Sequence, residues 1–138
     1  MRTAVVFFSI KNRNKLRKIA QNLAQGIEEQ GYYVDVIDAN HDVNTKLTIY
    51  NYIALGTESL TPFGGKISES IGNYLANSGI VRGKRSFAFI LGGGLRTAKT
   101  LSVLMNTMEH EGMYLKYSEV IGKAEEAREI GRQLHITT

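Results

Sequence analysis

The sequence predicts an α/β fold of three layers, in which a five-stranded parallel sheet of order 2-1-3-4-5 lies between helices and all of residues 1–138 form one domain. Two observations lead to this prediction. Short apolar runs of strand length alternate along the chain with longer segments whose apolar residues recur every three or four positions, as in amphipathic helices. Three of the runs are apolar throughout, which is typical of strands buried on both faces, whereas two alternate with polar residues, which is typical of edge strands.

The first strand is predicted at residues 4–8, which are β-branched or aromatic and too few for a helix. A polar loop, residues 9–14, leads from it into the first helix. The apolar residues of that helix share one face: Leu16, Ile19, Ala20, Leu23 and Ile27. Gly31 favours a helix end just before it. This is the opening of a βαβ unit, in which the helix N-terminus offers unpaired N–H groups to an anion.

The remaining strands are predicted at residues 33–38, 52–56, 87–91 and 114–121. Further helices are predicted over residues 67–78, 101–108 and 127–134. Residues 39–51 are mixed and polar, with room for a short helix over 43–47.

The strand order follows from the burial of the strands and the hand of their connections. The three wholly apolar strands belong in the middle of the sheet and the second and fifth at its edges, and right-handed crossovers then favour the flavodoxin-like order 2-1-3-4-5. In such sheets a ligand binds at the carboxyl ends of the strands, where the order reverses. We therefore expect a crevice at loops 9–14 and 57–65, with loop 92–96 beside it.

Composition limits the chemistry. With no cysteine, the chain itself has no disulfide and no cysteine-based metal site. The first apolar run is far too short to span a bilayer and no signal peptide is evident, so we expect a cytoplasmic protein without a membrane partner. His41, His110 and His135 are scattered, without acids at ligand spacing, so no metal site is predicted.

The net charge is +4, and basic residues gather around the first loop and helix. They are Lys11, Arg13, Lys15, Arg17 and Lys18. Cations in a first helical turn oppose the macrodipole, so we expect this region to repel itself until an anion binds. The alternative is that they form a solvated helix face. Binding of nucleic acid is disfavoured because the interleaved aromatic residues of such surfaces are missing.

With these residues in view, the sequence resembles the flavodoxin family over nearly its whole length. The resemblance rests on the strand-loop-helix opening, on the apolar strand that ends in Gly56-Thr57, and on Gly83-Lys84-Arg85 before a strand that ends in glycines. It implies a flavoprotein that binds FMN non-covalently and acts in electron transport or as an oxidoreductase with a redox partner protein. The first loop departs from the family's pattern, because only Ser9 matches, and Asn12 and Asn14 stand where the family has a glycine and a hydroxyl residue.

The resemblance also implies which residues contact the cofactor. The positions that correspond to the family's phosphate loop include Ser9, Asn12 and Asn14. Independently of the resemblance, Lys11, Arg13 and Lys15 could contribute charge-assisted bonds to the phosphate. The residues assigned to the flavin ring are Thr57, Glu58, Ser59, Leu60, Phe63, Gly92, Gly93 and Gly94. The chain has no tryptophan, so ring stacking falls to Phe63 or a tyrosine.

Several alternatives stay open. Glu58 is either a proton-handling residue beside a flavin or a solvated loop acid, and the three glycines either admit a flat ring or form a flexible turn. The whole domain is either a flavin protein or a flavin-free module that recognises another phosphorylated small molecule or a protein partner.

Overall fold

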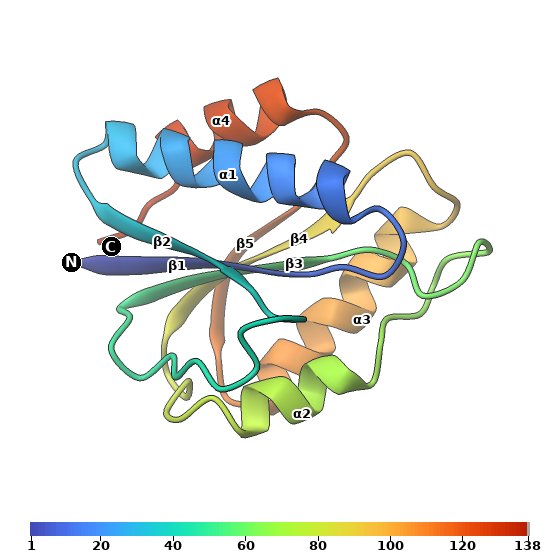
Figure 1. Cartoon of the computed structure of the whole chain (residues 1–138), viewed down its shortest axis with the longest axis horizontal. Helices are drawn as coiled ribbons and strands as arrows, with labels where there is room; N and C mark the ends of the chain where they lie inside the picture. Colours follow the sequence, from blue (N-terminus) through green and yellow to red (C-terminus); the bar gives the residue numbers. More distant parts are fainter. Residues whose placement is uncertain (138) are drawn as a thin grey trace.

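Five parallel strands form the central sheet in the order β2-β1-β3-β4-β5, which confirms the predicted topology (Figure 1). The computed structural model describes residues 1–137. Its strands are β1 (Arg2–Phe8), β2 (Tyr33–Asp38), β3 (Tyr52–Thr57), β4 (Arg85–Leu91) and β5 (Tyr114–Ile121). Its helices are α1 (Arg13–Glu29), α2 (Ser70–Ala76), α3 (Thr97–His110) and α4 (Ala124–Gln133).

The helices form one layer on each side of the sheet, α1 and α4 on one face and α2 and α3 on the other (Figure 1). Because successive strand residues point to opposite faces, the unbroken apolar run of β1 supplies both cores. Val5 and Phe7 belong to the core beneath α1 and α4, whereas Ala4 and Val6 belong to the core beneath α2 and α3. All four are at most 1% exposed, as a doubly covered strand requires.

The connection between β2 and β3 contains no helix, so the prediction of a short helix over residues 43–47 is wrong. Contacts with distant parts of the chain hold this segment instead. The Leu47 N–H donates to the Ser78 carbonyl at 2.7 Å. The Lys84 Nζ donates to the carbonyls of Leu47, Thr48 and Tyr50 at 3.3, 2.5 and 2.5 Å. Burial lowers the pKa of this ammonium group.

Helix α2 is shorter than predicted. It begins at Ser70, so the buried Ile67 packs into the core from the preceding loop, and it ends before Ser78. Helix α4 likewise ends at Gln133, one residue before the buried Leu134.

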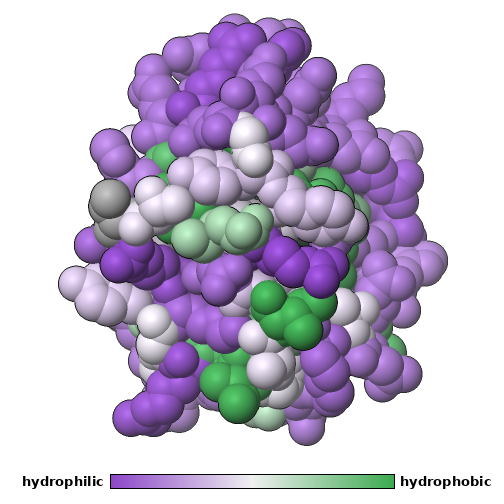
Figure 2. All heavy atoms as spheres, turned by 90° about the vertical axis from the view of Figure 1, so that its left-hand side faces the viewer, coloured by the Kyte–Doolittle hydropathy of each residue, from purple (hydrophilic) through white to green (hydrophobic). Residues whose placement is uncertain are grey.

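The N-terminus lies at the end of the sheet opposite the loops that follow the strands (Figure 1). Figure 2 shows that this face is mostly polar and that its apolar side chains form small, separated groups. Over residues 1–137, no helix combines the length and apolar character needed to cross a membrane.

Candidate functional site

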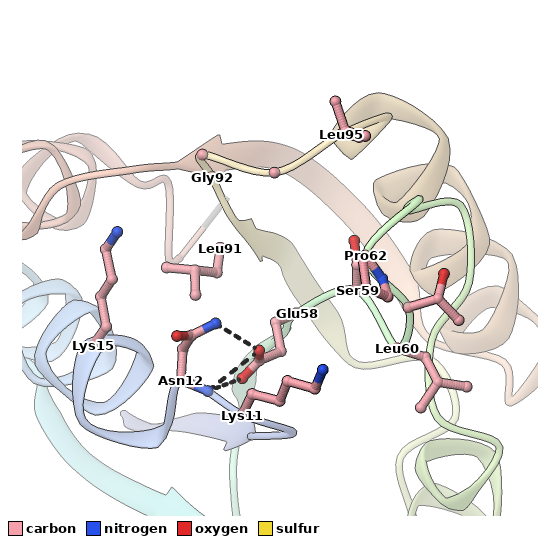
Figure 3. A pocket seen from close by; sticks show the side chains of 13 residues that line it. Lys11, Asn12, Lys15, Glu58, Ser59, Leu60, Pro62, Leu91, Gly92 and Leu95 are labelled. Carbon is pink, nitrogen blue, oxygen red and sulfur yellow. Dashed lines mark hydrogen bonds between the residues drawn. The ribbon is translucent and has the colours of Figure 1, made fainter.

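A cavity of about 380 Å³ opens at the carboxyl ends of β1, β3 and β4, which is the predicted crevice (Figure 3). Three loops build its walls. The start of α1 contributes Lys11, Asn12 and Lys15, the loop after β3 contributes residues 58–62, and the end of β4 with its loop contributes residues 91–95.

Glu58 lies at the centre of the polar side of this cavity. Its side chain is only 5% exposed, so the interpretation as a solvated loop acid is wrong. The Ile10 and Asn12 N–H groups donate to its Oε2 at 2.9 and 3.0 Å, and the Asn12 side-chain Nδ2 donates to its Oε1 at 3.0 Å (Figure 3). The carboxylate is therefore held by the loop that precedes α1.

This arrangement gives the start of α1 an acceptor. The helix has no side-chain cap and no acid in its first turn, so its N-terminal N–H groups depend on partners from elsewhere. Glu58 accepts from the N–H of Asn12, the N-cap residue, and from the N–H of Ile10 just before the helix. The region that was expected to repel itself until an anion binds therefore contains a carboxylate of the chain's own, held by backbone N–H groups.

Two residues of the predicted phosphate loop face β2 rather than the cavity. Both the N–H and the hydroxyl of Ser9 donate to Oδ1 of Asn40, at 2.8 and 3.1 Å. Arg13 lies 2.5 Å from Oδ2 of Asp38 and also contacts His41. Neither Ser9 nor Arg13 lines the cavity, and the exposed Asn14 does not line it either.

At the end of β3 and in the loop that follows it, some of the predicted residues line the cavity and others do not. Thr57 is fully buried, and its hydroxyl donates to the Phe8 carbonyl at 2.6 Å. Ser59 lines the cavity while its hydroxyl lies 3.0 Å from that of Thr100. Leu60 also lines the cavity, but Phe63 does not, and its side chain is 74% exposed.

The glycine loop after β4 lies against the loop after β3. All three predicted glycines, 92–94, line the cavity. Gly64 has a φ of +74°, and a Cβ there would lie 1.9 Å from the Leu95 carbonyl oxygen. Arg96 adopts the left-handed conformation with φ of 52°, immediately before α3. Tight packing and unusual backbone angles therefore fix the distance between the two loops.

Four lining residues were not named among the expected cofactor contacts, although three of them lie in the predicted loops: Thr61, Pro62, Leu91 and Leu95. The sequence does mark Leu95 as a candidate, because a large apolar residue directly after three glycines lies in a loop rather than in a core element. In the structure Leu95 is 62% exposed. The sequence does not mark Leu91, since it ends an apolar strand and is indistinguishable in sequence from core.

Comparison with solved structures agrees with this architecture. A flavodoxin from the domain Archaea matches with a TM-score of 0.66 over 96% of this chain and 94% of that chain. The fold is flavodoxin-like. A flavodoxin from Streptococcus pneumoniae TIGR4 matches with a TM-score of 0.71 over 96% of this chain and 94% of that chain. The flavodiiron protein from Giardia intestinalis matches with a TM-score of 0.64 over 95% of this chain and 33% of that chain.

Sequence identities to these three proteins are 17%, 15% and 15%, so the likeness establishes the fold alone. No family model matches the sequence, and no curated protein does.

Proposed function

We propose that this chain binds a flavin non-covalently in the cavity and serves in electron transfer or flavin-dependent reduction. The observation that carries the proposal is the lining of the cavity at the point where the strand order reverses. Glycine backbone forms one wall, leucine side chains form part of the others, and the volume of about 380 Å³ lies within the range of small-molecule sites.

The residues present suit the ring end of a flavin. Without side chains, Gly92, Gly93 and Gly94 let a flat ring approach the backbone. The Gly92 N–H already donates to the Ile121 carbonyl at 2.8 Å, so donation to ring carbonyls falls to the N–H groups of Gly93 and Gly94. Leu60 and Leu95 offer apolar surface from the two loops (Figure 3). An apolar wall in place of an aromatic one buries the ring without stacking it.

The phosphate end of FMN suits the site less directly. Lys11 and Lys15 line the cavity and could pair with a phosphate. The N–H groups of Ile10 and Asn12, however, already donate to Glu58. A phosphate that used these donors would need Glu58 to move.

When bound, the flavin supplies the electron-transfer chemistry, and the chain's own residues orient it, exclude water and set the polarity around it. The net charge of +4 favours a redox partner with an acidic docking face.

A flavin-free binding module is the second candidate, and Glu58 is the observation that favours it. Loop 9–14 already has an acceptor for two of its N–H groups, so the fold does not depend on a phosphate to satisfy them.

The test is titration of the purified protein into FMN and riboflavin, followed by flavin fluorescence and absorbance. Leu95→Ala should weaken flavin binding, because Leu95 lines the cavity. Ile80→Ala is the matched control, since Ile80 is 63% exposed against 62% for Leu95 and lies outside the cavity lining. Absence of binding by either flavin would reject the proposal. Equal losses in both variants would remove the cavity as the site.

A further inference from the structure

We propose that Glu58 is a specificity-determining residue: its carboxylate is an internal anion that competes with a ligand's phosphate for loop 9–14. A flavin or similar ligand then gains little affinity from carrying a phosphate. The part that concerns flavins rests on the proposed function, whereas the competition with oxyanions does not.

The geometry of Glu58 is that of an anion in a backbone nest. Oε2 accepts from the N–H groups of Ile10 and Asn12, and Oε1 accepts from the side chain of Asn12. The contacts span 46 and 48 positions along the chain, so the fold brings this acid to the loop. At 5% exposure, the carboxylate has left bulk water and depends on these donors.

A phosphate and the Glu58 carboxylate cannot share this position. Both are anions that accept from the same N–H groups, and both gain from the positive end of the α1 macrodipole. A phosphate that enters must therefore displace Glu58, which then has to recover its hydrogen bonds from water or from other groups. The affinity for the phosphorylated ligand falls by the cost of that exchange.

The surrounding charges do not remove this competition. Arg13 is paired with Asp38 and does not line the cavity. Lys11 and Lys15 do line it, and within residues 1–137 neither forms an ion pair with an acid. They remain available to an incoming phosphate once Glu58 has moved, so its removal should convert the loop into an anion site.

The experiment compares wild type with Glu58→Ala and Glu58→Gln by measuring dissociation constants for FMN and riboflavin. In wild type we expect the two constants to agree within about threefold, because the phosphate finds its donors occupied. Glu58→Ala should lower the dissociation constant for FMN by about tenfold or more and change that for riboflavin by less than about threefold. Glu58→Gln should also lower the dissociation constant for FMN, because glutamine keeps the shape of the side chain without its charge.

The control is Glu109→Gln, which removes one exposed carboxylate near the end of α3, outside the cavity lining. It should leave both constants unchanged, whereas an equal gain for FMN would reduce the effect to net charge and overturn the proposal. The proposal is also overturned if either Glu58 variant binds FMN no more tightly than wild type. If Glu58→Ala does not fold, Glu58→Gln decides.

A second measurement separates this proposal from the proposed function. Thermal melts in phosphate and in chloride at matched ionic strength require no flavin. Phosphate should raise the melting temperature of the Glu58 variants and not that of wild type or Glu109→Gln. If no variant binds flavin but this pattern holds, the proposed function fails and the role of Glu58 as an internal anion stands. If phosphate stabilises wild type and the variants equally, the competition is refuted.

Discussion

Helices α1 and α4 pack through two glycines, Gly26 and Gly131, and this contact makes a sharp prediction about stability. A Cβ added at Gly26 would lie 2.1 Å from the carbonyl oxygen of Arg128 and 2.9 Å from both the Gly131 Cα and the Arg132 nitrogen. All three atoms belong to the backbone, so rotation of a side chain cannot relieve the overlap. In Gly26→Ala the two helices must separate.

Two opposing terms set the magnitude. Alanine is about 1 kcal/mol more favourable than glycine within a helix. Overpacking in a tight interior costs about 1–3 kcal/mol, and here the upper end applies because the overlap is with backbone. The net effect is a loss of about 2 kcal/mol in the free energy of unfolding. For a chain of this size that lowers the melting temperature by about 5–8 °C.

The assay is urea unfolding followed by circular dichroism, with thermal melts on the same samples. Gly72→Ala in α2 is the matched control, because a Cβ there meets only the Thr107 Cγ2, at 3.8 Å. That variant should gain up to about 1 kcal/mol from helix propensity. If Gly26→Ala proves as stable as Gly72→Ala, the close approach of α1 and α4 is not present in solution.

Three further predictions concern other contacts. Hydrogen bonds from Arg128 and Arg132 lower the pKa of Glu29 from 4.5 to about 2. The ionised carboxylate therefore stabilises the folded state fully above about pH 4.5, and this stabilisation is lost as the pH falls towards 2. Glu29→Gln should flatten the unfolding free energy against pH in that window, and an unchanged slope would contradict the pairing. Lys84→Met removes the ammonium donor of three carbonyls, of which, within residues 1–137, only that of Leu47 keeps another donor, the Tyr50 N–H at 3.1 Å. The variant should lose about 1.5–3 kcal/mol of unfolding free energy in urea and be cleaved faster within residues 39–51, and wild-type behaviour would exclude this role of Lys84. Phe63→Ala should leave flavin affinity unchanged in a fluorescence titration, because Phe63 lies outside the cavity lining, and a loss of affinity would restore the stacking role.

The fold could be predicted from sequence because its signals are local and repeated. The pattern of apolar and polar residues in each strand indicates how far the strand is buried. The contrast between residues 4–8 and residues 33–38 therefore already separates a central strand from an edge strand. Strand β5, Tyr114–Ile121, has the predicted bounds. Connection handedness then leaves little choice of order.

The site was harder to predict from the sequence because its most important contacts join residues that are far apart along the chain. Nothing around Glu58 in the sequence indicates burial, since its partners Ile10 and Asn12 lie more than forty positions earlier. Phe63 was chosen for its aromatic ring, but its side chain faces solvent. The loop that carries it is closed by a hydrogen bond from the Leu60 N–H to the Lys66 carbonyl, at 2.8 Å, and Gly64 adopts a positive φ.

The basic cluster near α1 was predicted to repel itself, and the structure supplies acids to part of it. Oδ2 of Asp38 lies 2.5 Å from Arg13 and 3.8 Å from Arg17. Asp38, at the end of β2, therefore pairs with both cations and offsets one of their two charges. The remaining members of the cluster form no ion pair among the residues described: Lys11, Lys15 and Lys18.

Attraction of an anion and its final binding are therefore governed by different groups. The unpaired lysines act over several ångströms, so they speed the approach of an anion in a way that salt weakens. The short-range donors of loop 9–14 are held by Glu58, and their exchange determines how long the anion stays. Replacing Glu58 should thus slow dissociation of FMN and leave the salt dependence of its association rate largely intact. Stopped-flow traces at several salt concentrations measure both rates, and an effect confined to association would contradict this division.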